Sequence, residues 1–154
     1  MLDPFARIRA ARGALGMSQA QLAREAGVHR NTVAAIEQGA TIYVAMLLAC
    51  QHALERHGVE FLEISGRLGV ILPPKTSRGS QMLAARVGMT LDQRKFGRLA
   101  GIDRQTVGNV EKDSDSIAVD TIALCLKVLS DLDVVLLDLD ARPAVLFPKS
   151  SVRK

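Results

Sequence analysis

The feature that most constrains this chain is a stretch that occurs twice, at residues 17–39 and again at residues 91–113. A shift of 74 positions aligns the two copies, and eight residues then agree. The matched residues are Gln19, Arg24, Ala26, Gly27, Arg30, Thr32, Val33 and Glu37 in the first copy and Gln93, Arg98, Ala100, Gly101, Arg104, Thr106, Val107 and Glu111 in the second. A pattern repeated in this way predicts two similar units within one polypeptide.

Each copy predicts two short helices that are joined at a glycine. Ser18 is a helix-capping residue, and Gln21 three positions later completes a capping box. Gly27 stands where a helix can end in the left-handed conformation, which glycine adopts at little cost. A second helix is then expected to begin at His29. The equivalents of Ser18, Gly27 and His29 in the second copy are Asp92, Gly101 and Asp103.

Apolar residues recur in each copy at positions that form one buried face. Ala23 and Gly97 are small at the point where two steeply crossed helices come closest. Two short helices crossed in this way form a helix-turn-helix, and the sequence contains that pattern twice. The residues expected to face inward are Leu22, Val28, Val33 and Ile36, matched by Phe96, Ile102, Val107 and Val110.

The residues around the first motif predict the remainder of a small unit. Residues 1–15 have the spacing of an opening helix. Thr41 is expected to cap a helix over residues 42–57, and the mostly apolar sequence of that helix predicts deep burial. Residues 59–64 and 69–72 then predict a β-hairpin.

The second half repeats this order of elements, with one residue inserted after its motif. Ser116 is expected to cap a helix over residues 117–131, followed by strands at 134–139 and 144–147. Agreement over the whole unit points to duplication, and the expected fold class is mainly α with a small β portion. The expected divisions are a first domain at residues 1–73, a linker at 74–79, a second domain at 80–148 and a tail at 149–154.

The two expected hairpins are too apolar to stand alone. Residues 59–64 and 134–139 carry apolar side chains on both faces, more than a lone hairpin packed on a helix needs. A four-stranded sheet shared by the two halves would bury those side chains and cover strand edges. Pairing of the strands between two chains, which would give a homodimer with four motifs, is the alternative.

Composition excludes several classes of function. The chain has 154 residues, 48% of them hydrophobic and 23% charged, so it can bury a core. Aromatic residues make up only 3%, which disfavours single-stranded nucleic acid because its bases stack on aromatic side chains. A formal charge of +4 is compatible with a polyanionic partner. Neither a signal peptide nor an apolar run long enough for a membrane is apparent, so we expect a cytoplasmic protein.

Catalytic and metal-binding functions find no support in the pattern of reactive residues. Cys50 and Cys125 occupy equivalent places inside apolar helices, where cysteine serves as a small core residue. His52 and His57 lie five positions apart on one helix, the wrong spacing for two ligands on one face. Since a phosphate-binding glycine loop is also lacking, we expect no enzyme activity, no metal and no cofactor.

Both halves resemble the lambda-repressor and Cro-like helix-turn-helix family, also called the Xre family. The resemblance rests on the Ser/Asp-Gln opening, the central glycine, the Thr-Val pair and the final glutamate of each motif. It implies that an arginine of each opening helix binds that glutamate and fixes the angle between two helices. The chain departs from the family in its hairpins, which replace a fifth helix, and in an acidic loop over residues 112–116, where Asp113 replaces the Gly39 of the first copy. The implied pairs are Arg12 with Glu37 and Arg86 with Glu111.

The resemblance also implies which residues contact DNA, because the second helix of such a motif enters the major groove. Arg30 can bind a guanine and Asn31 an adenine edge, while Ala35 is small enough for close approach. Gln19 and Gln93 resemble the family's phosphate-contacting glutamine. The full set of expected DNA contacts is Gln19, His29, Arg30, Asn31, Ala35 and Gln38 in the first motif and Gln93, Arg104, Gln105, Asn109 and Lys112 in the second.

The expected function is therefore that of a transcriptional regulator, more specifically a repressor, that binds double-stranded DNA. One chain would supply two reading helices and bind an imperfect palindrome as a pseudo-dimer. The alternative is a protein-interaction module, such as an antiactivator or antitoxin, in which one or both motifs bind a regulatory protein partner. The low net charge and the acidic loop of the second motif motivate that alternative.

Overall fold

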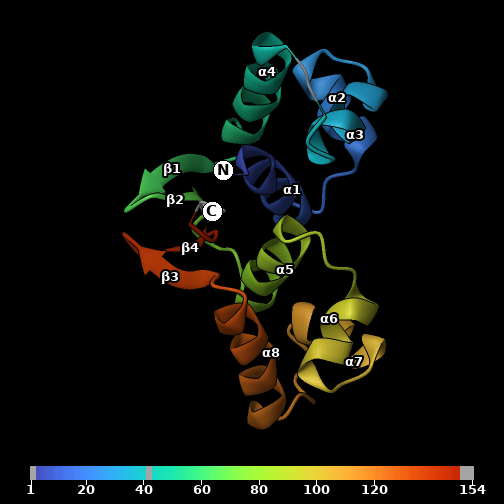
Figure 1. The fold of residues 1–154 in the computed structure, drawn as a ribbon, viewed down its shortest axis with the longest axis vertical. Coiled ribbons are helices and arrows are strands. Elements are labelled where there is room, and N and C mark those ends of the chain that lie inside the picture. The colour runs from blue at the N-terminus through green and yellow to red at the C-terminus, as the bar shows by residue number, and fades with distance from the viewer. Residues whose placement is uncertain (1–2, 41–42, 150–154) are drawn as a thin grey trace, which may run out of the picture.

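The computed structural model describes residues 3–40 and 43–149, and the same order of elements occurs twice within them (Figure 1). The first series is α1 (Pro4–Ala14), α2 (Gln19–Ala26), α3 (Arg30–Glu37), α4 (Val44–Glu55), β1 (Glu60–Ile64) and β2 (Arg67–Ile71). The second series is α5 (Arg78–Gly88), α6 (Gln93–Ala100), α7 (Arg104–Glu111), α8 (Val119–Asp131), β3 (Val135–Leu139) and β4 (Arg142–Leu146). Mainly helical structure with a small antiparallel sheet is confirmed. None of the described helices has the length and apolar character needed to cross a membrane.

The two opening helices pack against each other at the centre of the molecule (Figure 1). A side chain at Gly13 would place a carbon 3.1 Å from the Leu83 side chain, so α1 and α5 are in close contact at that glycine. Arg9 is also buried here and donates from Nη2 to the carbonyl of Gly88 at 2.7 Å. The helix α5 begins at Arg78, so the last two residues of the stretch expected to be a linker are helical.

The helix α4 differs from the prediction in its burial. Thr41 and the first residue of the predicted helix lie outside the described residues, and the described helix begins at Val44. Its packing leaves Val44 69% and Leu48 43% exposed, so the expectation of deep burial is wrong for its first half. An apolar sequence shows that a helix can be buried, whereas the number of neighbouring elements decides how much of its circumference is covered.

The cap predicted for the equivalent helix is also wrong. The helix α8 begins at Val119, with Ala118 in the N-cap position and no side-chain cap. The hydroxyl of Ser116 instead lies 3.0 Å from that of Ser114, within the loop that follows α7. A turn closed by the backbone N–H of Ile117, which donates to the carbonyl of Ser114, delays the start of the helix.

Both hairpins turn through two residues with positive φ. Ser65 and Gly66 have φ of 52° and 79°, and Asp140 and Ala141 have φ of 52° and 62°. Left-handed residues at both central positions match the right-handed twist of the flanking strands. Because the turn is this short, β2 begins at Arg67 and not at the predicted residue 69.

The hairpins join into one antiparallel sheet of four strands in the order β1-β2-β4-β3. The central pair runs through Val70, whose partner is Val145. Val145 is also the counterpart of Val70 in the second half. Pairing of equivalent residues means that β2 and β4 meet through the same surface, as two subunits do in a symmetric dimer. The shared sheet of four strands is therefore formed within one chain.

Arginines at the start of β2 and β4 reinforce this junction reciprocally. Arg67 donates to the carbonyl of Asp133 and to its carboxylate, both at 2.7 Å, and to the carbonyl of Phe147 at 3.4 Å. Arg142, the counterpart of Arg67, donates to the carbonyls of Gly58 and Leu72 and to the carboxylate of Glu60. Each arginine thus binds the backbone of the opposite half.

Candidate nucleic-acid interface

The predicted caps and turn of each motif are confirmed. Ser18 and Gln21 form a capping box at the start of α2, and Gly27 ends the helix with φ of 71°. In the second motif Asp92 accepts from the backbone N–H of Lys95 at 2.7 Å. That hydrogen bond holds the pKa of the Asp92 carboxyl below its usual value. Gly101 ends α6 with φ of 76°, as predicted.

The crossing of the two helices in each motif depends on small residues and a buried apolar face. Gly97 is the tightest position, because an added side-chain carbon would lie 2.6 Å from the carbonyl oxygen of Ile102. Ala23 fills the equivalent place in the first motif and is also buried. The inward residues that are fully or almost fully buried are Leu22, Val33 and Ile36 in the first motif and Phe96, Val107 and Val110 in the second.

A buried ion pair ties the end of α3 to the opening helix. Arg12 donates to both carboxylate oxygens of Glu37, from Nε at 2.5 Å and from Nη2 at 2.8 Å. Its Nη1 donates to the carbonyl of Met17 at 2.8 Å, so one guanidinium holds α3 and the turn before α2 together. Arginine with two parallel bonds to a carboxylate is among the most directional ion pairs in proteins.

The second unit repeats this arrangement around Arg86. Its Nε and Nη2 donate to Glu111 at 2.6 and 3.0 Å, and Nη1 donates to the carbonyl of Leu91 at 2.7 Å. The Glu111 side chain is only 4% exposed and that of Arg86 10% exposed. The same three hydrogen bonds therefore orient α7 on α5.

The glutamine that begins the first helix of each motif makes a contact that sequence reasoning missed. Gln19 Nε2 donates to Glu37 at 3.0 Å, and Gln93 Nε2 donates to Glu111 at 3.1 Å. Both glutamines were assigned by resemblance to DNA phosphate alone. Each side chain is partly exposed, so it lies between the buried glutamate and the solvent. The sequence signal for this contact was the equal spacing of Gln and Glu in the two copies.

The outward faces of α3 and α7 carry the polar residues assigned to DNA. His29, Arg30, Asn31 and Gln38 are exposed, and Ala35 is partly buried. The corresponding face of α7 exposes Arg104, Gln105 and Lys112, with Asn109 partly buried. Both motifs lie on the side of the molecule away from the sheet, one above and one below the central pair of opening helices (Figure 1).

The residues that begin α3 and α7 cap these helices with different chemistry. His29 Nδ1 accepts from the backbone N–H of Asn31 at 3.1 Å. Asp103 Oδ1 accepts from the backbone N–H of Thr106 at 2.7 Å. Hydrogen bonds from the Thr106 side chain and backbone hold the pKa of the Asp103 carboxyl below its usual value. The first helix therefore begins with an imidazole and the second with a carboxylate.

An open hollow of about 410 Å³ lies beside the start of α6 and α7. Arg94 and Arg104 are exposed at its wall, and Arg86 lies deeper. Asp92 and Gln93 complete the lining. Two exposed guanidinium groups at one hollow suit a phosphate of a nucleic-acid backbone.

One aspartate of the acidic loop has a structural role that the sequence did not reveal. Asp113 adopts a φ of 58°, and its carboxylate accepts from the backbone N–H of Gly79 at 2.8 Å. That N–H belongs to the first turn of α5, where an anion is favoured. In the first unit, Gly39 and Phe5 occupy the positions equivalent to Asp113 and Gly79, and they pack together. The Asp113 carboxylate is thus bonded to the first turn of α5, and both Asp113 and Asp115 are exposed.

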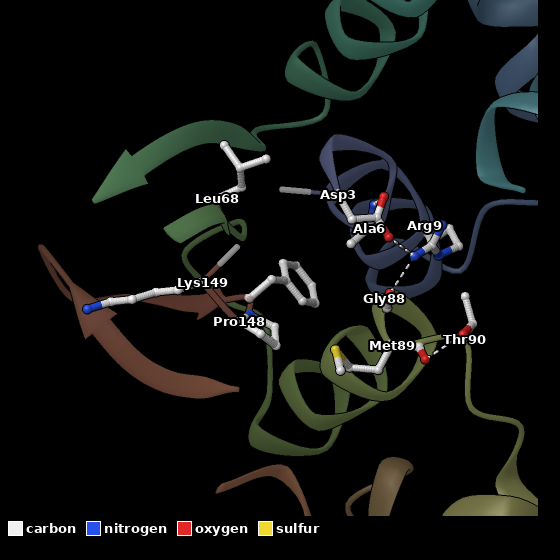
Figure 2. Close-up of a pocket in the computed structure, with 10 residues that line it drawn as sticks. Asp3, Ala6, Arg9, Leu68, Gly88, Met89, Thr90, Pro148 and Lys149 are labelled. Atoms are coloured by element: carbon white, nitrogen blue, oxygen red, sulfur yellow. Dashed lines mark hydrogen bonds and ion pairs between the residues drawn. The ribbon is translucent and has the colours of Figure 1, made fainter. Parts of the chain in front are cut away.

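The described residues also include a buried thiol and a second hollow. Burial raises the pKa of the Cys50 thiol to about 11, which keeps it protonated and unreactive at neutral pH. A hollow of about 280 Å³ lies between α1, the end of α5 and the sheet. Figure 2 shows its lining residues, with Arg9 bonded to Gly88. Over residues 3–40 and 43–149, no group of three or more His, Cys, Asp or Glu side chains has the arrangement of a metal site.

Comparison with known proteins bears on the first unit. No curated protein and no solved structure matches the chain. A family model described as Helix-turn-helix matches residues 8–61, which include α2, α3 and α4. The N-terminal part of the chain thus matches a helix-turn-helix domain, and this supports a DNA-binding role.

Proposed function

We propose that this protein is a sequence-specific regulator of transcription that binds double-stranded DNA through both of its motifs. It binds rather than catalyses, and it acts most directly as a repressor by occupying its site. Each chain is the product of a tandem duplication and works as an intramolecular pseudo-dimer. The site it reads is an imperfect palindrome, because the exposed faces of α3 and α7 differ.

The observation that carries this proposal is the reciprocal junction between the two halves. Val70 pairs with its own counterpart Val145, and Arg67 and Arg142 bind opposite halves in the same way. A junction of this kind relates the two motifs by an approximate two-fold rotation. Duplex DNA has matching two-fold symmetry, and dimeric helix-turn-helix proteins use it to place two helices in successive major grooves about 34 Å apart.

The side chains at the outward faces support recognition of both phosphate and bases. Arg30 and Asn31 are exposed on α3 and have the geometries that bind guanine and adenine edges. Gln19 and Gln93 lie at helix starts, where phosphate contacts set the register of the protein on the duplex. The buried pairs below these faces hold each helix at a fixed angle, so little ordering is needed on binding.

Selection of binding sites from random double-stranded DNA tests the proposal. We expect two half-sites with different sequences at one fixed separation. Inserting five base pairs between them should reduce affinity strongly, since it rotates one half-site to the opposite side of the duplex. A single half-site with no preferred partner would contradict the use of both motifs, and no enriched sequence would contradict the function itself.

A protein partner is the second candidate function, and exposed apolar side chains favour it. Tyr43 is 78%, Val44 69% and Val119 81% exposed, at the starts of α4 and α8. Such side chains are common at protein interfaces. Purification from the native cell with a bound protein, together with no shift of any genomic DNA fragment, would support this candidate over the first.

A further inference from the structure

The two motifs differ in hydrogen-bonding character at the residue that begins the DNA-facing helix. His29 and Asp103 occupy equivalent positions, and both are exposed. Each uses one atom to cap its helix, through Nδ1 of His29 and Oδ1 of Asp103. A ligand at the start of α3 or α7 therefore meets the remaining polar atoms of these two side chains.

The capping hydrogen bond determines which ring nitrogen of a neutral His29 carries the proton. A ring nitrogen that accepts a hydrogen bond carries no proton, so the proton of the neutral imidazole lies on Nε2. Among the residues that the structure describes, none binds this Nε2–H. His29 thus presents a single donor, in a ring whose orientation is already set by the cap.

Asp103 presents the opposite chemistry. The hydrogen bonds from Thr106 keep the pKa of its carboxyl low, so the group is ionised at neutral pH and can only accept. Oδ1 accepts from the Thr106 N–H, and the Thr106 side chain also donates to the carboxylate, whose remaining lone pairs face the solvent. A carboxylate at this place selects a donor, and it repels a phosphate.

We propose that His29 and Asp103 are specificity-determining residues that make the two half-sites differ at one equivalent base pair. The Nε2–H of His29 binds the acceptor edge of a guanine, and Asp103 accepts from the amino group of a cytosine. This inference rests on the proposed function, in which α3 and α7 enter major grooves. The first residues of such helices contact base edges, and guanine offers two acceptors there while cytosine offers an amino donor.

The test compares sites selected by the natural protein with those selected by His29→Asp and Asp103→His. Both residues already cap a helix in this chain, so each exchange retains a capping group. His29→Asp should change the preferred base in the first half-site from guanine to cytosine and weaken binding to the original site about tenfold. Asp103→His should make the reverse change in the second half-site only. A third variant, His29→Ser, retains a strong cap and should lose the preference without gaining the other.

Three results would overturn the inference. Identical selected sites for all proteins would mean that both residues are caps alone. An equal loss of affinity on every sequence would mean that His29 contacts phosphate. If the natural protein selects no sequence at all, the proposed function fails as well. Thermal unfolding of each variant by circular dichroism separates loss of the fold from loss of recognition.

Discussion

Removing the carboxylate of Glu111 should destabilise the second unit more than any single exposed substitution. Glu111 accepts two hydrogen bonds from Arg86 and one from Gln93, and its side chain is 4% exposed. Glu111→Ala leaves a guanidinium with 10% exposure without its counter-charge. Breaking a buried pair in this way costs about 3–5 kcal/mol of unfolding free energy. We expect a value near the upper end of that range.

The equivalent substitution in the first unit gives the matched comparison. Arg12 is 20% exposed, twice as much as Arg86, so water can solvate its charge after Glu37→Ala. The expected loss is therefore near the lower end, about 3 kcal/mol. Urea unfolding followed by circular dichroism measures both values on the full chain.

A double substitution separates the unpaired charge from the value of the pair itself. Arg86→Met combined with Glu111→Leu removes both charges and fills the site with apolar side chains. Because no buried charge remains, this variant should be much more stable than Glu111→Ala. A loss below about 1 kcal/mol for Glu111→Ala, or a double variant as unstable as the sum of its parts, would refute the reasoning.

Three further predictions follow from the motifs. Gly97→Ala should cost about 1–3 kcal/mol in urea unfolding, because its new carbon would lie 2.6 Å from the Ile102 carbonyl; unchanged stability would contradict the packing. The pKa of the Asp103 carboxyl is lowered in the folded protein, so its ionised form stabilises the fold. This stabilisation is fully present above the unfolded pKa of about 3.9 and is lost as the pH falls through the folded pKa. In Asp103→Asn that part of the acid dependence should disappear when urea midpoints are compared between about pH 6 and pH 2. Arg30→Ala should weaken binding to the selected site by about 1–3 kcal/mol and relax one base position, whereas Arg24→Ala, on α2, should leave the selected sequence unchanged.

Much of this fold follows from local rules that the sequence displays directly. Ser18, Gly27 and Gly101 define where the motif helices begin and end, and the structure has them in those roles. Capping and left-handed glycine depend on neighbours a few positions away, so they can be read from a short window. The shared sheet was predictable for another reason, because two hairpins with apolar residues on both faces need partners.

The features that sequence reasoning missed depend on contacts between distant segments. Gln19 binds Glu37 across the motif, and Asp113 binds the first turn of α5. Neither side chain differs in type from an exposed polar residue, so composition cannot separate the two cases. Exposure of Val44 was missed because an apolar helix has the same pattern whether one or several neighbours cover it.

The stoichiometry of the DNA complex tests the central claim most directly. The mass of the complex with a selected full site should be measured by light scattering coupled to size-exclusion chromatography, at increasing protein concentration. One chain bound per duplex at saturation, with both half-sites protected from cleavage, is the expected result. Two chains per duplex, each protecting one half-site, would show that the two motifs of a chain do not act together.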